Sequence, residues 1–454
     1  MSVKLINPAT GELIGEMQMQ SDVEVESAIG GSTEAFGHWR KTGLDVRLQC
    51  VRDFAEAVHG SRVELAEAMT REMGKTLKES LAESDKCAAS CKTLADEFPR
   101  WLEHAEYKTS AGHSVTRQPL GPLLGIMPWN FPLWQVVRFA VPAILCGNSI
   151  LLKHAPNTWG SAEFIEGLFR RAFPDQLYIN LRVGVETAGK VIADMRVRGV
   201  SLTGSRAAGM SVGAQAGAAL KKCVLELGGS DAYVVLDDAD VEQAAAVCAQ
   251  SRLLNAGQSC VSAKRFIVTK KNVSVFTESM REKLAAQKFG DPTLSGTDFG
   301  PMARQDLRAQ LHGQVERSVK SGARLTLGGT IPDTKGFFYP ASLLAGVEPG
   351  QAAFDEELFG PVAAVITAKD EADAFRLANR SRYGLGGAVF SRDVERAKAL
   401  ATSEMEAGMV FINDFVKSDT LFPFGGVKDS GLGRELGHDG CLEFTNIKTV
   451  YAKA

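Results

Sequence analysis

The stretch VSLTGSRAAGMSVG, residues 200–213, decides the fold class of this chain. A short apolar run ends at Thr203, Gly204 and Ser205 form a turn, and small residues then open a helix. A strand, turn and helix in this order present backbone N–H groups and a helix N-terminus, which together suit a phosphate. Small residues are common at such turns, so a purely structural turn remains an open alternative.

Three similar apolar runs precede this stretch: LLGIMP (123–128), NSILLKH (148–154) and QLYINLR (176–182). The segments between them are helical in pattern and about fifteen to twenty residues long, which is typical of a strand–helix–strand unit. Such units form parallel sheets with right-handed crossovers. Ligands of these sheets bind at the carboxyl ends of the strands.

A second α/β series begins near Leu227 and Gly228, where we place the main domain boundary. Residues 21–104 are helical in pattern, and Gly74 is a candidate helix end. The opening INPATGELIGE predicts two short strands around a Thr10–Gly11 turn. The tail, residues 438–454, alternates in polarity and predicts a strand that pairs with residues 107–121.

The composition is that of an ordinary globular protein, with 454 residues, 45% apolar residues and a net charge of −3. This charge gives no general reason to expect nucleic acid or an anionic membrane as a partner. The N-terminus has no targeting character, and no apolar run approaches the ~20 residues of a membrane span, so we expect a cytoplasmic protein. Eight cysteines are too few for a disulfide scaffold. Cys87 and Cys91 lack further ligands nearby, so packing is favoured over a metal site.

Four polar residues are candidates for chemistry. Cys260, in LLNAGQSCVSAKR (253–265), follows a flexible glycine-containing segment and is either a nucleophile or a packed thiol. Asn130 lies between two prolines and either donates to an oxyanion or bonds its own backbone. Glu226 ends an apolar run and is either a desolvated base or an exposed loop residue. Lys153 offers a cation for an adenosine ribose or its phosphate, or lies on the surface.

Taken together, these segments resemble the aldehyde dehydrogenase superfamily over essentially the whole chain. The matching stretches, in order, are PWNFP, LLKHAP, LTGSRAAG, ELGGSDAYVV, NAGQSC, GDPTLSGTDFGPM, EELFGPV, YGLGGAVF and PFGGVKDSGLGRELG. The resemblance implies two α/β domains with parallel-sheet cores and a small oligomerisation β-element. We assign residues 1–108 and 127–227 to a Rossmann-like cofactor domain, 228–415 to a catalytic domain, and 109–126 and 440–454 to oligomerisation strands.

The resemblance also implies roles for the candidate residues. Cys260 would attack the aldehyde to give a thiohemiacetal, Asn130 would help form the oxyanion hole, and Glu226 would activate the water that hydrolyses the later thioester. No metal is implied. The cofactor NAD or NADP would be held by residues from several motifs: Trp129, Lys153, Thr203, Gly204, Ser205, Gly209, Glu357 and Phe359.

Two features refine this reaction. Branches of the family that pass the acyl group to coenzyme A generally lack a glutamate at position 226, so its presence favours hydrolysis to a free acid. Many NAD-preferring relatives have a glutamate after Lys-Pro-Ser, whereas this chain has Lys153, His154, Ala155 and Pro156. Without that carboxylate a 2′-phosphate is not repelled, so we expect NADP to be accepted, with NAD left open.

The chain is similar to the short forms of the succinate-semialdehyde branch, which implies that Arg138 and Ser418 bind the substrate carboxylate. Leu254 and Ser262 stand where some members carry a second arginine and a redox-active cysteine, so we expect a weaker clamp and no local disulfide. Trp134 and Gln135 line the channel or merely pack. The alternatives are glutarate semialdehyde, a general aliphatic aldehyde, a coenzyme A-acylating member and a catalytically silent member. The family implies a homodimer or homotetramer.

Overall fold

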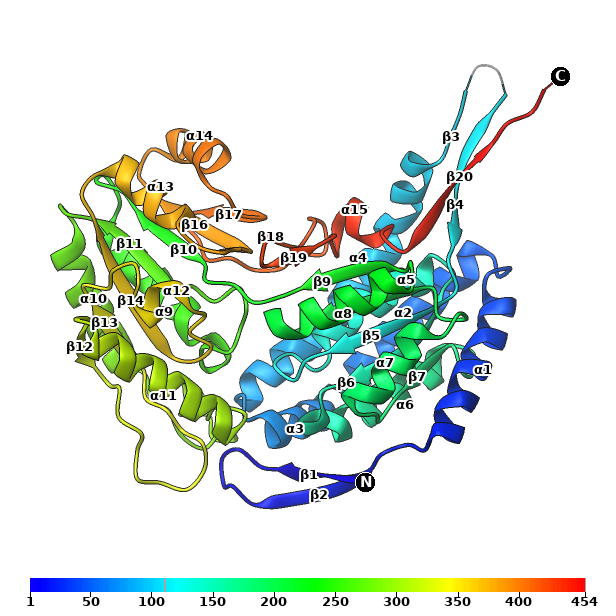
Figure 1. The fold of residues 1–454 in the computed structure, drawn as a ribbon, viewed down its shortest axis with the longest axis horizontal. Helices are drawn as coiled ribbons and strands as arrows, with labels where there is room; N and C mark the ends of the chain where they lie inside the picture. The colour runs from blue at the N-terminus through cyan, green and yellow to red at the C-terminus, as the bar shows by residue number, and fades with distance from the viewer. Residues whose placement is uncertain (110–111, 454) are drawn as a thin grey trace.

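The computed structural model describes residues 1–109 and 112–453, which form two α/β lobes and a projecting arm (Figure 1). The predicted fold class is confirmed, because each lobe is built on a mainly parallel sheet. Apolar residues form extensive buried cores in both lobes. Within residues 1–109 and 112–453, no helix has the length and apolar composition needed to cross a membrane.

The first lobe contains a six-stranded sheet in the order β19-β9-β8-β5-β6-β7. Its strands are β5 (Pro122–Met127), β6 (Ser149–His154), β7 (Tyr178–Asn180), β8 (Gly199–Thr203), β9 (Lys222–Glu226) and β19 (Gly431–Leu432). All neighbours are parallel except β19, which returns antiparallel to β9. The predicted strands at 123–128, 148–154, 176–182 and 197–204 are therefore confirmed.

Helices cover both faces of this sheet (Figure 1). The helices of this lobe, some of which pack on other helices, are α1 (Asp22–Trp39), α2 (Leu44–Gly60), α3 (Arg62–Met73), α4 (Leu77–Ala105), α5 (Trp134–Leu145), α6 (Trp159–Ala172), α7 (Val185–Ala193) and α8 (Arg206–Ala218), with the short 3-10 helix η1 (Pro156–Thr158). The predicted end at Gly74 is confirmed: Gly74 caps α3 with a φ of 87°, a conformation that favours glycine. The predicted opening hairpin is also present, as β1 (Ser2–Ile6) and β2 (Leu13–Gln18).

The second lobe contains a seven-stranded sheet in the order β12-β13-β14-β11-β10-β16-β17. Its strands are β10 (Ala232–Val235), β11 (Arg265–Thr269), β12 (Arg324–Leu327), β13 (Ser342–Ala345), β14 (Val362–Ala368), β16 (Gly386–Phe390) and β17 (Met409–Ile412). The helices of this lobe are α9 (Val241–Leu253), η2 (Leu254–Gly257), α10 (Val273–Ala285), α11 (Gln305–Lys320), α12 (Ala352–Asp355), α13 (Glu371–Asn379) and α14 (Val394–Glu404). A small pair, β15 (Tyr383–Gly384) with β18 (Val427–Lys428), lies beside it.

The arm is a three-stranded sheet in the order β20-β4-β3, which projects away from both lobes (Figure 1). It contains β3 (Tyr107–Lys108), β4 (Ser114–Pro119) and, after the short helix α15 (Gly437–Cys441), β20 (Thr445–Val450). The predicted pairing of the tail with residues 107–121 is confirmed, with Thr445 opposite Pro119 and Val450 opposite Ser114. Residues 110, 111 and 454 of the predicted oligomerisation strands lie outside the described residues.

Two predicted boundaries need correction. Residues 107–108, assigned above to the cofactor domain, form β3 of the arm sheet. Residues 122–126, assigned above to the oligomerisation strands, belong to β5 between β8 and β6. The reason is hydrophobic burial, since Leu123 and Leu124 are fully buried between helices on both faces. The arm therefore ends at Pro119, and the first lobe begins again at Pro122.

Candidate active site

Cys260 lines two cavities in the described part of the chain and is the one residue that these two cavities share. The first, which we call the turn cavity, has a volume of about 420 Å³ and contains the turn 203–207 in its wall. The second, the helix cavity, has a volume of about 200 Å³ and lies beside α4 and α5. A thiol between two cavities can meet a different molecule on each side.

The loop before Cys260 is rigidly held. Asn255 and Ala256 have φ values of 55° and 53°, in the left-handed region that few side chains adopt. Gly257 follows with a φ of 71°, and a Cβ there would collide with the carbonyl of Gly360. Arg252 Nη1 donates to Ala263 O at 2.7 Å and Arg252 Nη2 to Gly257 O at 2.5 Å. The expectation of a flexible segment before Cys260 is therefore wrong, because buried hydrogen bonds hold this backbone.

Asn130 is joined to the same loop. Its side chain is buried, its Nδ2 donates to Gln258 O at 3.1 Å, and its backbone oxygen accepts from Asn255 Nδ2 at 2.8 Å. The Asn130 amide carries a second N–H and lines the turn cavity. Asn130 and Cys260 thus lie on one cavity wall, as an oxyanion donor and a nucleophile require.

Burial governs the acidity of the nucleophile. Desolvation raises the pKa of the Cys260 thiol to about 12, while the positive charges of Arg138 and Lys264 oppose this rise. Lys264 Nζ donates to the carbonyls of Ser259 at 2.9 Å and Cys260 at 2.7 Å. The sulfur is a protonated thiol in this arrangement, so attack on a carbonyl requires a group that removes its proton.

Glu226 ends β9 and is buried, but it lines neither cavity. Its carboxylate oxygens have no hydrogen-bond partner among the described residues. Desolvation raises its pKa well above the usual value, the charge of Arg138 opposes this rise, and Glu435 adds to it. Glu226 is therefore a neutral acid beside the site, and it must rotate to act on anything bound at Cys260.

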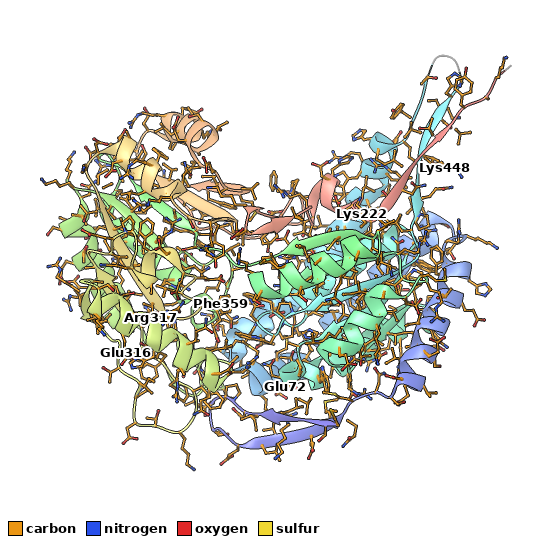
Figure 2. The ribbon with its side chains drawn as sticks, in the orientation of Figure 1. Glu72, Lys222, Glu316, Arg317, Phe359 and Lys448 are labelled. Carbon is orange, nitrogen blue, oxygen red and sulfur yellow. The ribbon has the colours of Figure 1, made fainter. Side chains whose placement is uncertain are left out.

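The turn cavity brings together most of the predicted cofactor residues. Its walls contain Trp129, Thr203, Gly204, Ser205, Glu357 and Phe359. The rings of Trp129 and Phe359 meet edge to face with centroids 5.9 Å apart. Phe359 lies where the two lobes face each other (Figure 2). Glu357 Oε1 accepts from Gly229 N at 3.0 Å and lies 3.5 Å from Lys264 Nζ, so the carboxylate is fixed.

Two predicted cofactor residues do not line the turn cavity. Gly209 lies on α8, where a Cβ would collide with Leu227, so this glycine lets the helix approach the strand end. Lys153 is the last residue but one of β6, which lies beside β5, and burial lowers the pKa of its ammonium. Its Nζ makes one long hydrogen bond, 3.5 Å to His154 O. A buried, poorly satisfied cation at the carboxyl edge of the sheet suits a ribose oxygen or a phosphate.

The helix cavity brings together the predicted substrate residues. Arg138, Ser418, Trp134, Gln135 and Leu254 all line it with Cys260. Arg138 forms an ion pair with Glu435, donates to Thr203 Oγ1 at 3.3 Å, and lies over the Phe424 ring at 4.3 Å. Its charge is thus already balanced by a carboxylate of this chain. Leu254 is 38% exposed and forms an apolar part of the cavity wall, at the position where some members of the succinate-semialdehyde branch carry a second arginine.

Three residues around the site were not identified from the sequence. Lys86 of α4 lines the helix cavity, Lys264 holds the Cys260 backbone, and His154 holds the PWNFP loop. His154 lies 2.9 Å from Pro132 O, and burial lowers the pKa of the imidazole to about 4, so the ring is neutral. The only sign of His154 in the sequence is its position at the end of an apolar run. The same position pointed to the neighbouring Lys153, whose charge suits a phosphate.

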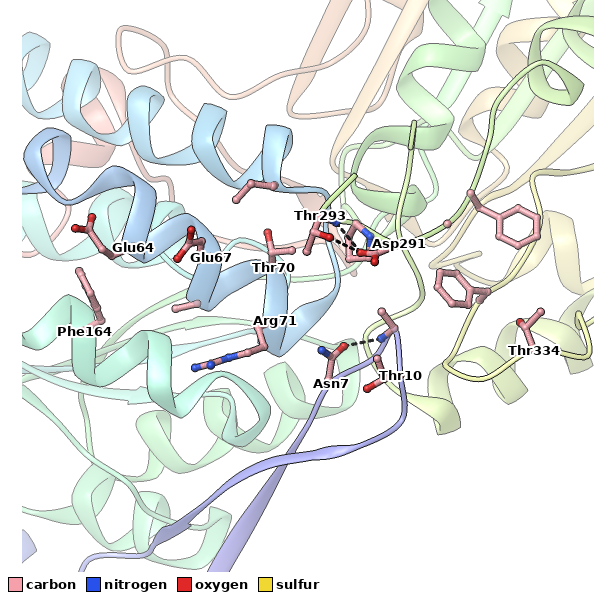
Figure 3. A pocket seen from close by; sticks show the side chains of 17 residues that line it. Asn7, Thr10, Glu64, Glu67, Thr70, Arg71, Phe164, Asp291, Thr293 and Thr334 are labelled. Carbon is pink, nitrogen blue, oxygen red and sulfur yellow. Dashed lines mark hydrogen bonds between the residues drawn. The ribbon is translucent and has the colours of Figure 1, made fainter. Parts of the chain in front are cut away.

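A larger cavity lies elsewhere in the described part of the chain. It has a volume of about 940 Å³ and lies between the Asn7–Thr10 turn, α3 and residues 289–293 (Figure 3). Its polar lining includes Glu64, Glu67 and Arg71, and none of the predicted site residues is part of it. The volume of a cavity therefore does not identify the candidate active site of this chain.

Comparison with known proteins agrees with this arrangement. Residues 1–450 match the model of the aldehyde dehydrogenase family. The chain is 46% identical to the succinate semialdehyde dehydrogenase [NAD(P)+] Sad of Escherichia coli K12, covering 98% of this chain and 97% of that protein. It is 42% identical to a probable succinate-semialdehyde dehydrogenase [NADP(+)] of Synechocystis sp. PCC 6803, covering 99% and 100%.

Among solved structures, the succinic semialdehyde dehydrogenase of Streptococcus pyogenes in complex with NADP+ superposes with a TM-score of 0.96 at 36% identity, covering 99% of this chain and 100% of that one. The sequence match runs through both lobes and the arm, and the structural match preserves how they are arranged. The resemblance inferred from the sequence motifs is thus confirmed: this chain belongs to the aldehyde dehydrogenase family.

Proposed function

We propose that this protein oxidises succinate semialdehyde to succinate with NADP or NAD. The observation that carries the proposal is Cys260, which lies between the turn cavity and the helix cavity. The turn cavity has the helix N-terminus and ordered aromatic rings that suit a dinucleotide, and the helix cavity has cations that suit a carboxylate. The relatives named above act on this aldehyde.

In the proposed reaction, a base removes the Cys260 proton and the thiolate adds to the aldehyde carbon. A C–S bond forms, the carbonyl oxygen becomes an alkoxide, and the free Asn130 N–H stabilises its charge. Bound NAD(P)+ supplies the acceptor for the hydride that leaves this carbon. Glu226 then rotates towards Cys260, where better solvation lets it release its own proton. As a carboxylate it removes a proton from water, which attacks the thioester, breaks the C–S bond and releases succinate.

We further propose that Lys153 and the start of α8 hold the adenosine end of the cofactor. Ser205 caps α8, accepting from Ala208 N at 3.3 Å, and leaves the other N-terminal N–H groups available for an anion. His154, Ala155 and Pro156 place no carboxylate beside Lys153. A 2′-phosphate meets a cation there without an opposing charge, which supports use of NADP as well as NAD.

The proposed substrate is tested with a panel of aldehydes assayed with NADP and with NAD. We expect kcat/KM for succinate semialdehyde to exceed that for butanal at least tenfold, because a desolvated charge-assisted contact is worth about that factor or more. Glutarate semialdehyde should fall between them. Butanal turning over as well as succinate semialdehyde would instead support a general aliphatic aldehyde dehydrogenase. Progress is followed by the absorbance of the reduced cofactor.

We also propose a homodimer or homotetramer assembled through the arm. β20 is an edge strand of the arm; Ile447 and Val450 on it are 61% and 47% exposed, and Tyr451, directly after it, is 71% exposed. Unpaired edge strands with exposed apolar residues are common pairing surfaces. The occupant we propose is a second copy of this chain.

Charges on this strand should dissociate the oligomer. In the double variant Ile447→Glu, Tyr451→Glu, light scattering should give a smaller assembly than the wild type, because carboxylates cannot be buried without partners. Leu220→Glu, at a site 95% exposed outside the arm, is the matched control and should keep the wild-type mass. An unchanged mass in the double variant would exclude the arm as the interface.

A further inference from the structure

The helix cavity contains a cation whose charge no carboxylate of the described residues neutralises. Lys86 of α4 is half-buried, and its Nζ donates to Ser418 O at 2.9 Å and to Ser418 Oγ at 2.8 Å. The ammonium also lies over the Trp134 ring, 4.2 Å from its centroid. Lys86 forms none of the ion pairs found within 4.0 Å in residues 1–109 and 112–453.

The neighbouring charges are already balanced or hydrogen-bonded. Glu83 pairs with Lys75 and accepts the N–H groups of Leu133 and Trp134, both at 2.9 Å. Glu79 caps the start of α4 and accepts from Asn255 N at 2.7 Å. Arg138, as described above, pairs with Glu435. The ammonium of Lys86 is thus the cation of this cavity left without an anion.

The hydrogen bonds around Ser418 leave two donors free. Ser418 Oγ accepts from Lys86 Nζ at 2.8 Å and from Trp134 Nε1 at 3.0 Å, so both lone pairs of the hydroxyl are used and its hydrogen must donate elsewhere. Lys86 has three N–H groups, of which two donate to Ser418. One N–H and one O–H therefore remain, side by side, on the wall of the helix cavity.

We propose that Lys86, held by Ser418 and Trp134, is the residue that selects aldehydes with a distal carboxylate. This inference rests on the proposed function of the site and adds the cation that determines specificity. The two free donors match the two oxygens of one carboxylate, and the charge of Lys86 is neutralised when the substrate binds. Because residue 254 is a leucine, no cation at this position of the cavity wall competes for the substrate carboxylate.

The direct test is Lys86→Met, which gives an unbranched side chain one atom shorter and removes the charge. We expect kcat/KM for succinate semialdehyde to fall about tenfold to a hundredfold, through KM, while kcat/KM for butanal stays within twofold. Lys86→Arg keeps the charge and should keep most of the preference. The matched control is Lys92→Met on the same helix, where the lysine is exposed and pairs with Glu56; it should change neither substrate.

The outcomes separate this inference from the proposed function. A wild-type enzyme without preference for succinate semialdehyde over butanal overturns the proposed function itself. A wild-type preference that survives in Lys86→Met overturns the role of Lys86 alone. An equal loss for both aldehydes also overturns it, because a structural role does not distinguish a carboxylate from a methyl group.

A second measurement is made on the wild-type protein, so its result does not depend on whether a variant folds. Burial lowers the pKa of Lys86 to about 8, so the wild-type ratio of kcat/KM for succinate semialdehyde to that for butanal should fall above pH 8, as the ammonium becomes neutral. Titrations that affect the chemistry of both aldehydes cancel in this ratio. A ratio that stays constant to pH 10 contradicts the inference, and Lys86→Arg should give such a constant ratio. The other titratable groups near Lys86 are Glu79, Glu83, Cys87, Arg138, Cys260, Lys417 and Asp419.

Discussion

Cys260→Ser is expected to lower kcat for succinate semialdehyde by about four orders of magnitude or more, the scale on which enzymes lose activity with their nucleophile. A serine hydroxyl is far less acidic than a thiol, and burial already raises the pKa of the Cys260 thiol to about 12. The substituted oxygen would stay protonated and would not add to the aldehyde carbon. Formation of reduced cofactor is the measurement.

The matched control for this substitution is Cys50→Ser. Cys50 is a half-buried thiol of α2 in the first lobe and lines neither the turn cavity nor the helix cavity, so its loss should leave kcat within twofold. Activity of Cys260→Ser within tenfold of the wild type would mean that no thiolate at residue 260 is needed. The mechanism proposed above would then be excluded.

Much of this fold could be predicted because its signals are local. The runs at 123–128 and 197–204 are apolar, short and followed by turns, and they form β5 and β8. The strand–turn–helix at 200–213 also forms as predicted, with Ser205 as the cap of α8. Periodicity and turn residues carry this information within a few residues of the position concerned.

The environment of the site could not be predicted, because it depends on contacts between distant segments. Lys86 lies in a long amphipathic helix, and nothing near it in the sequence indicates that Ser418 accepts its hydrogen bonds. Arg138 was expected to face a substrate carboxylate, and the structure supplies Glu435 as its partner. Whether Arg138 also contacts the substrate remains a prediction.

The loop before Cys260 shows a different limit of local reasoning. A glycine and small polar residues suggest flexibility, yet the backbone at Asn255 and Ala256 is held in the left-handed region. Asn255 bonds to Glu79 and Asn130, and the buried side chains of Arg252 and Lys264 bond to the carbonyls of the residues that follow in the loop. Local composition indicated a loop correctly, but only tertiary contacts determine how rigid that loop is.

Glu226→Gln is expected to separate the two halves of the reaction. Hydrolysis of the thioester should slow by about a hundredfold to ten-thousandfold, the range for loss of a general base. The first turnover should still yield about one reduced cofactor per subunit as a rapid burst, followed by slow steady turnover. Stopped-flow absorbance gives both rates. The control is Glu443→Gln, which breaks an ion pair with Lys222 on the same strand and should leave both rates unchanged.

The absence of a burst would assign Glu226 to a different step. Since the Cys260 thiol is protonated, some base must remove its proton, and equal slowing of the first and later turnovers would identify Glu226 as that base.

Misfolding of the Glu226→Gln variant is a poor explanation for either result. The raised pKa keeps Glu226 protonated in the folded protein, whereas the unfolded chain releases this proton above about pH 4.3. Wild-type stability therefore falls as pH rises from there towards the folded-state pKa. Glutamine resembles the neutral acid and removes this pH dependence, so at pH 7 the melting temperature of Glu226→Gln should equal or exceed that of the wild type.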